Sequence, residues 1–178
     1  MFSLNVPLPP AVDRLAADLH PKLTGFDRIR ERRTLVAKRF GADDVPGGRR
    51  RNAPKDAALA ALREELRPCL AGTAPLELAI TGVDAFELPA RGAGPVVYLV
   101  VESDALVRLH RRLCAAFDAI EGIEGEDYVP HVTLARGGAM APVDDLRATD
   151  VDPIRWRADE LSLYDPEFRE VAGRMGIA

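Results

Sequence analysis

The residues best suited to chemistry lie in one short run, Tyr128-Val129-Pro130-His131-Val132-Thr133-Leu134-Ala135-Arg136-Gly137. Side chains two residues apart on a β-strand share a face, so we expect His131 and Thr133 to stand side by side. Val132 and Leu134 would then turn the other way, into a core. An imidazole beside a hydroxyl, followed by the guanidinium of Arg136, suits a phosphoryl or carboxyl group.

A second interpretation of His131 is a hydrogen-bonded histidine in the core of a strand. The neighbouring Pro130, Thr133 and Arg136 favour the interpretation that His131 faces a groove and binds a ligand there.

The composition bounds the kind of protein that carries this run. The chain has 178 residues, 47% hydrophobic and 29% charged, with a formal net charge of −4, which predicts one folded domain spanning 1–178. No apolar run approaches the roughly 18 residues that span a bilayer, and the N-terminus does not resemble a signal peptide. Cys69 and Cys114 sit in helical patterns typical of buried free thiols and lack the spacing of a zinc site. We therefore expect a soluble cytoplasmic monomer that binds no membrane, metal or cofactor.

Positive charge is concentrated in one segment of this acidic chain. Its ten members are Arg28, Arg30, Arg32, Arg33, Lys38, Arg39, Arg49, Arg50, Arg51 and Lys55. Such a cluster can bind a polyanion or a small phosphate-bearing molecule. The alternative is a solvated face balanced by the interspersed acids Asp27, Glu31, Asp43 and Asp44. Both interpretations stay open at the level of sequence.

Hydrophobic periodicity predicts the elements that must position these residues. Besides the run at 131–135, strands are expected at 2–7, 34–40, 76–83, 96–101 and 154–164, the last with a bulge near Asp159-Glu160 where the alternation changes phase. Helices are expected at 11–20, ended by Pro21, at 55–71, after a cap at Ser103 or Asp104, and at 144–148. A loop is expected at 43–54.

The order of these elements contains an internal repeat. Two helix-to-strand units, 11–40 and 103–135, each end in a β-prone run with the dipeptide Thr-Leu. These runs are Arg32-Arg33-Thr34-Leu35 and His131-Val132-Thr133-Leu134. The pattern favours two lobes of similar architecture, with motifs near 32–35 and 131–134.

The run Pro130-His131-Val132-Thr133-Leu134-Ala135-Arg136 resembles the second signature of the two-histidine (2H) phosphoesterase superfamily, which includes 2′-5′ RNA ligases and cyclic phosphodiesterases. Nearly the whole chain resembles it in size, element order and the final strand Leu161-Ser162-Leu163-Tyr164. The resemblance implies a bilobal, pseudo-symmetric α+β fold. Two antiparallel sheets would form a V-shaped groove with helices on the outside, and one His-x-Thr/Ser pair from each lobe would face across it.

Two such pairs suit the opening of a 2′,3′-cyclic phosphate. The reaction is an in-line displacement, so one group takes a proton from the attacking water and another protonates the departing sugar oxygen. Histidine titrates near neutrality and can serve in either role, and the hydroxyls can donate hydrogen bonds to the phosphoryl oxygens. This chemistry requires no metal.

The first motif departs from the family pattern. Of the three histidines, His20 is expected at a helix C-terminus and His110 on the inner edge of a helix, both as structural residues. Alignment on the threonine puts Arg32 in the first histidine position, whereas alignment on the strand-ending Gly41 puts Thr34 there, and Arg33 lies between. The first histidine is missing in every register. Arginine cannot act as a base at neutral pH, although it can bind a phosphate through two hydrogen bonds.

Two functional hypotheses follow from the resemblance. The first is a 2′-5′ RNA ligase-like or 2′,3′-cyclic phosphodiesterase-type enzyme acting on RNA or nucleotide phosphodiesters, weak because one histidine is missing. The second is an inactive relative that binds RNA ends or nucleotides in the same groove. In a third interpretation, the fold serves an unrelated function.

In the enzyme hypothesis the catalytic pair is His131 with Thr133. Arg32, Thr34 and Arg136 bind the substrate phosphate. Tyr128 is a further candidate for binding the substrate. In the hypothesis of an inactive relative, Tyr128 or Tyr164 would offer a stacking surface for a base, with a buried structural tyrosine as the alternative for each.

Overall fold

The structure is a computed structural model that describes residues 2–41, 44 and 55–177. Apart from Asp44, the loop expected at 43–54 lies outside the described residues. The elements follow the order β1 (Phe2–Val6), α1 (Pro10–Leu23), β2 (Arg28–Ile29), β3 (Leu35–Phe40), α2 (Lys55–Leu70), β4 (Leu76–Phe86), β5 (Val96–Glu102), α3 (Asp104–Ala116), the 3-10 turn η1 (Gly125–Asp127), β6 (His131–Arg136), α4 (Ala141–Arg147), β7 (Ile154–Ala158), β8 (Glu160–Asp165) and β9 (Glu170–Gly176).

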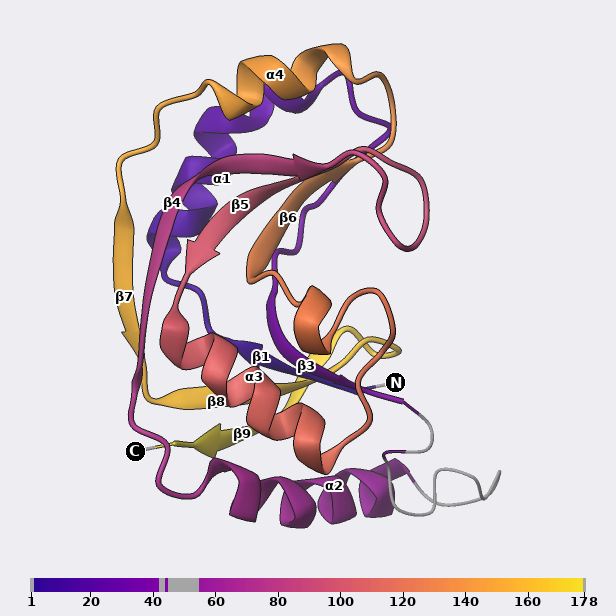
Figure 1. The fold of residues 1–178 in the computed structure, drawn as a ribbon, viewed down its shortest axis with the longest axis vertical. Helices are drawn as coiled ribbons and strands as arrows, with labels where there is room; N and C mark the ends of the chain where they lie inside the picture. The colour runs from indigo at the N-terminus through magenta and orange to yellow at the C-terminus, as the bar shows by residue number, and fades with distance from the viewer. Residues whose placement is uncertain (1, 42–43, 45–54, 178) are drawn as a thin grey trace.

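The strands form one strongly curled antiparallel sheet in the order β7-β4-β5-β6-β3-β1-β8-β9, and the short β2 pairs with β6 (Figure 1). The α+β class is therefore confirmed. The two expected sheets are the two halves of this sheet, β7-β4-β5-β6 and β3-β1-β8-β9. They are joined at the centre by a single residue pair, Leu35 with Val132. Strands β3 and β6, which carry the two motifs, are thus neighbours at the junction.

The chain passes from one half of the sheet to the other at Asp159. We expected one bulged strand over 154–164, and this expectation is wrong. β7 pairs with β4 at one edge, whereas β8 pairs with β1 in the other half. Figure 1 shows β7 running down one side of the molecule and β8 turning across it. The change of phase in the hydrophobic pattern marks this corner, because each strand buries its own alternate side chains.

The helices bury one face each against the sheet. α1 packs beside β6, α4 packs beside β4, and α3 packs beside β3. α2 lies next to α3 (Figure 1). Ser103 caps α3 as expected, since its Oγ accepts a hydrogen bond of 3.1 Å from the backbone N–H of Leu106. α1 continues past Pro21 to Leu23, contrary to expectation, because the burial of Leu23 offsets the hydrogen bond that proline cannot donate.

Two further observations bear on the expectations from composition. Cys69 and Cys114 are free thiols, and both are half-buried rather than buried. Among the described residues, no helix is long and apolar enough to cross a membrane.

Candidate functional site

A groove of about 660 Å³ lies over the junction of the two halves of the sheet. Strands β3 and β6, the segment between β4 and β5, and the segment between α3 and β6 supply its walls. The six residues expected to form a site all line it, namely Arg32, Thr34, Tyr128, His131, Thr133 and Arg136. A second cavity of about 740 Å³, between the end of α2 and β9, contains none of them. Of these two cavities, we place the candidate site in the first, because it is the one where an imidazole and two hydroxyls converge.

His131 is half-buried in the groove wall, and its orientation is fixed. Its Nδ1 lies 2.7 Å from the carbonyl oxygen of Val129, which can only accept, so Nδ1 carries the proton and Nε2 carries the lone pair. Nε2 makes no hydrogen bond to any residue the structure describes. The ring edges of Phe86 and Tyr98 pack against the imidazole, with centroids 5.2 Å away. The expected alternation holds, since Val132 and Leu134 are buried on the opposite face.

Burial lowers the pKa of His131 below its ordinary value of 6.5, and the positive charges of Arg39 and Arg136 lower it further. The hydrogen bond to Val129 acts in the opposite direction but does not outweigh burial. His131 is therefore neutral at pH 7, with an unprotonated Nε2. A neutral imidazole in this position can accept a proton from a nucleophile.

The pair Leu35–Val132 defines how the two motifs correspond. β3 and β6 are antiparallel, so a local two-fold axis passes between the paired residues and relates the strands. This relation maps Thr34 onto His131 and Val36 onto Thr133. These four side chains all line the groove. The geometry matches the register anchored on Gly41: Thr34 stands in the first histidine position, and a valine stands in the first threonine position.

Both strands carry a β-bulge at the same mapped position. In β3 the bulged residue is Ala37, because Val36 pairs with Asn5 and Lys38 pairs with Leu4.

In β6 the bulged residue is Leu134, because Thr133 pairs with Tyr98 and Ala135 pairs with Val97. The local two-fold relation maps Ala37 onto Leu134. Since the bulges recur at equivalent positions, the relation extends beyond the central pair.

Each bulge shifts by one residue the alternation of side chains between the groove and the core. An arginine after the bulge therefore faces the groove. After Ala37 this arginine is Arg39, and after Leu134 it is Arg136, and both line the groove. Strict alternation from Thr34 would have placed Lys38 on the groove face, which is why the sequence did not single out Arg39. The signal lay in the equal spacing, since each arginine follows its Thr-or-His position by five residues.

The basic segment divides between the groove and the body of the protein. Arg30, Arg32 and Arg39 line the groove, joined there by Arg91 and Arg136. Among the lining residues that the structure describes, Asp127 is the one acid. Other members form ion pairs, namely Arg33 with Asp13 (2.8 Å), Lys38 with Glu124 (2.7 Å) and Lys55 with Asp165 and Glu167 (2.6 Å each). Arg49–Arg51 lie outside the described residues. Each of the two interpretations of the cluster therefore describes part of it.

Three of the expected binding residues are already engaged within the protein, and one of them, Arg136, donates from Nη1 to the carbonyl of Arg91 at 2.7 Å. Arg32 is exposed at the rim, where it donates hydrogen bonds to the hydroxyl of Tyr164 (3.3 Å) and to the carbonyl of Arg169. Tyr128 stacks on His110 at a centroid distance of 3.7 Å and donates its hydroxyl to the carbonyl of Val36 at 2.8 Å. Burial raises the pKa of Tyr128. Tyr128 thus lines the groove with one ring face already covered.

The remaining histidines lie away from the groove lining. His110 is fully buried in α3. Its Nδ1 donates to the carbonyl of Ala37 (2.7 Å), and its Nε2 accepts from the backbone N–H of Gly125 (2.8 Å). Both ring nitrogens are therefore occupied by backbone groups. His20 is exposed in the last turn of α1.

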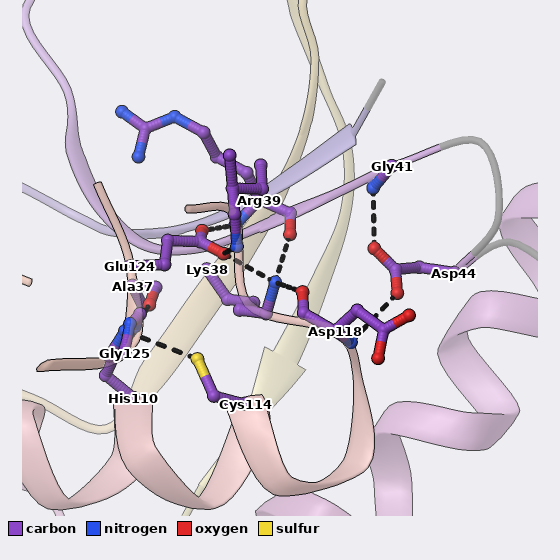
Figure 2. Close-up of polar contacts among 11 residues, drawn as sticks. Ala37, Lys38, Arg39, Gly41, Asp44, His110, Cys114, Asp118, Glu124 and Gly125 are labelled. Carbon is purple, nitrogen blue, oxygen red and sulfur yellow. Dashed lines mark hydrogen bonds and ion pairs between the residues drawn. The ribbon is translucent and has the colours of Figure 1, made fainter. Parts of the chain in front are cut away.

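A buried ion pair braces β3 behind the groove (Figure 2). Lys38 donates to Glu124 and to the carbonyls of Arg39 (2.6 Å) and Asp118 (2.9 Å). The carboxylate of Glu124 accepts in addition from the backbone N–H groups of Arg39 (2.7 Å) and Ile120 (3.0 Å). These bonds hold the bulged part of β3, and hence the backbone of Arg39, against the segment that precedes β6.

Within the described ranges, no three or more His, Cys, Asp or Glu side chains gather in a way that could hold a metal ion. The groups that converge on the groove are an imidazole, two threonine hydroxyls and guanidiniums. This set can bind a phosphate through charge and hydrogen bonds and can move one proton at His131.

Comparisons with known proteins agree with the resemblance in the sequence. A family model described as the 2′-5′ RNA ligase superfamily matches residues 34–167. The fold is similar to the crystal structure of the protein TT0787 of Thermus thermophilus, with a TM-score of 0.63 and 19% identity over 99% of this chain and 97% of that one. No curated protein matches the sequence.

Proposed function

The chain belongs to the 2′-5′ RNA ligase superfamily, and we propose that its groove binds a phosphodiester of RNA or of a nucleotide and turns it over weakly. The observation that carries the proposal is the convergence of His131, Thr133, Arg39 and Arg136 on one groove. A 2′,3′-cyclic phosphate is the substrate class that this set fits best.

His131 supplies one half of the required proton transfer. With its neutral Nε2 as general base, it takes a proton from the water that attacks phosphorus. The Thr133 hydroxyl and the arginines stabilise the negative charge that grows on the phosphoryl oxygens. The hydrogen bond to Val129 holds the imidazole in the correct tautomer for this role.

The second proton transfer, to the departing sugar oxygen, lacks a histidine. The departing sugar oxygen would meet Thr34, whose hydroxyl does not titrate near pH 7 as a histidine does. Loss of one general acid or base costs about 10²–10⁴ in rate. The proposed turnover is therefore slow, although the groove keeps its affinity for phosphate.

A second candidate function is binding without turnover. It is favoured by the replacement of both members of the first motif, with Thr34 and Val36 at the mapped positions, while five arginines still line the groove. In this case the protein would bind RNA ends or nucleotides.

Turnover of a 2′,3′-cyclic nucleotide by the purified protein tests the first function. We expect slow opening of the ring that is lost in His131→Ala and kept in His20→Ala, a matched change at an exposed histidine. Unchanged turnover in His131→Ala would contradict the role of His131.

Titration of short RNAs with 3′-phosphate or cyclic ends at two salt concentrations tests the second function. Salt-sensitive binding without turnover would support it, because release of counterions makes phosphate binding weaken as salt rises. Absence of both turnover and salt-sensitive binding would refute both candidates.

A further inference from the structure

We infer that Phe86 forms a base-binding subsite beside His131, in which one face of the phenyl ring stacks on the nucleobase of the bound nucleotide. The inference rests on the proposed function, which places the phosphate of that nucleotide at His131, and it gives the base a position in the groove. Stacking needs only the flat face that every base has, so this subsite would bind all four bases.

Phe86 lies in the wall of the groove, close to His131. It is the last residue of β4, where the chain enters the segment between β4 and β5, and it is half-buried and lines the groove. Across the sheet, Phe86 pairs with Val96 of β5, which pairs with Arg136 of β6. One strand therefore separates Phe86 from the strand that carries His131.

The ring of Phe86 has one covered face. Tyr98 lies nearly parallel to it, with ring centroids 4.3 Å apart and an angle of 30° between the planes. The imidazole of His131 stands at 87° to Phe86, and its centroid lies 5.2 Å from that of Phe86 and 5.2 Å from that of Tyr98. Because these two distances are equal, His131 packs beside the stacked pair, and neither ring covers the face of Phe86 opposite Tyr98.

Tyr98 supports the phenyl ring from the buried side, since its side chain is only 5% exposed. Among the residues that the structure describes, no other aromatic ring and no cation lies over Phe86. A ring that is held on one face loses little freedom when a ligand stacks on the other, which lowers the entropic cost of binding.

The groove lining that the structure describes contains one other aromatic residue, Tyr128. Its ring stacks on His110, and its hydroxyl is bonded to the carbonyl of Val36 on β3. Of the two aromatic residues in the lining, Phe86 is the one whose ring contacts the imidazole of His131. A nucleotide whose phosphate binds at His131 therefore has Phe86 beside it.

The side chains next to Phe86 in the strand pairing and in the chain offer apolar contact. Val96, Leu88 and Val129 line the groove, and Leu88 and Val129 are 95% and 40% exposed. A base that covers them removes apolar surface from water without a requirement for one hydrogen-bonding pattern. The charged groups of the lining are five arginines and Asp127, and a hydrogen bond from one of these to a base edge would instead select a particular base.

Calorimetric titration with two kinds of ligand tests the inference. The first kind is the 2′,3′-cyclic phosphate of each of the four nucleosides, and the second is the 2,3-cyclic phosphate of methyl riboside, which has the same sugar and phosphate but no base. We expect each nucleotide to bind about 5- to 150-fold more tightly than the methyl riboside ligand, the range for stacking of one base on an aromatic side chain. The four nucleotides should differ from one another by about 10-fold or less, because stacking tolerates any base.

Substitutions assign this preference to Phe86. Phe86→Leu should weaken binding of the nucleotides about 5- to 150-fold and leave binding of the methyl riboside ligand unchanged, whereas a purely structural loss would weaken both. Phe168→Leu is the matched control, at an exposed phenylalanine between β8 and β9 and outside the groove lining, and it should change neither.

Phe86→Trp keeps a stacking ring and adds a fluorescent reporter, and it also serves if the leucine variant unfolds. It should retain the preference for nucleotides, and its fluorescence should be quenched by the nucleotides but not by the methyl riboside ligand. The wild-type protein gives the background signal, since its one tryptophan, Trp156, lies on β7 and donates its indole N–H to the carbonyl of Pro7 at 3.1 Å.

The failures of the two proposals are distinguishable. Equal affinity of the wild-type protein for the nucleotides and the methyl riboside ligand would overturn the inference and leave the proposed function standing, since the phosphate would still bind. A loss in Tyr128→Leu that Phe86→Leu does not show, or a preference of about 100-fold or more for one base over the other three, would also overturn it. Absence of binding of all five ligands would overturn both proposals.

Discussion

Strand β6 brings His131, Thr133 and Arg136 to the groove, and strand β3 brings Thr34, Val36 and Arg39 to the mapped positions. Both strands present these side chains to the groove. Both also have a bulge at the mapped position, and in both an arginine follows the bulge. They differ at the two positions to which the proposed function assigns the proton transfer and the contact with the phosphoryl oxygens. An arginine therefore lines the groove on both sides, whereas an imidazole that could transfer a proton lines it on one side, that of β6.

The two bulges are also stabilised differently. The carbonyl of Ala37 accepts from the buried imidazole of His110, whereas the carbonyl of Leu134 accepts from the backbone N–H of Arg30 at 2.7 Å. Behind the bulges, the buried ion pair of Lys38 supports β3, while the mapped position in β6 is Ala135, a small core residue. The β3 side therefore depends on buried polar contacts that the β6 side does not need.

The largest expected effect comes from placing the missing histidine and threonine on β3. The double variant Thr34→His/Val36→Thr restores the missing pair and should raise turnover of a 2′,3′-cyclic nucleotide by about 10²–10⁴, because it supplies the second proton-transfer group. Arg32→His is the matched control and should give no such gain, since Arg32 lies at the rim and not at the mapped position. A gain in Arg32→His alone would contradict the correspondence between β3 and β6.

Breaking the brace behind β3 should have the next largest effect. Lys38→Met leaves the carboxylate of Glu124 buried without its cation and should lower the free energy of unfolding by about 3–5 kcal/mol. Lys38→Met/Glu124→Gln should recover part of this loss, because it removes the uncompensated charge while the amide oxygen can still accept from a backbone N–H that Glu124 binds.

Denaturant unfolding measures these changes. The exposed pair Arg174–Glu160 gives the control, since Glu160→Gln should cost about 1 kcal/mol or less. A similar small cost for Lys38→Met would refute the brace.

A smaller effect is expected on the titration of His131. Arg39 and Arg136 each lower the pKa of His131, so Arg39→Gln or Arg136→Gln should move it up toward its ordinary value. Because turnover needs the neutral imidazole, the rate should fall as the pH falls through this pKa, below 6.5 in the wild type. Each variant should shift the fall to higher pH.

Imidazole NMR signals followed with pH measure this shift directly. Arg111→Gln, at an exposed arginine on α3 outside the groove, should leave the titration unchanged. If only Arg136→Gln moved the pKa, Arg39 would not share the site with His131.

Much of the groove could be predicted from the sequence, because the pattern that orients these side chains lies within single strands. Alternation along β6 placed His131 and Thr133 on one face, and the resemblance to the superfamily brought 32–34 opposite them. Arg39 was named only as a member of the basic segment and not as a site residue, because a bulge depends on cross-strand pairing with β1, which no local pattern records. The corner at Asp159 was missed for a related reason, since the pairing partners of β7 and β8 lie far away in the sequence. β9 was missed because its two glycines and two charged residues leave no hydrophobic period.

The central claim is that both strands bind one phosphate in the groove between them. NMR of the histidine and arginine side chains during titration with a 2′,3′-cyclic nucleotide tests it most directly. If both strands bind the ligand, signals of His131, Arg39 and Arg136 should shift together, with the same apparent dissociation constant. Shifts confined to Arg63 and Arg67, which line the other cavity, with His131 unchanged, would contradict it.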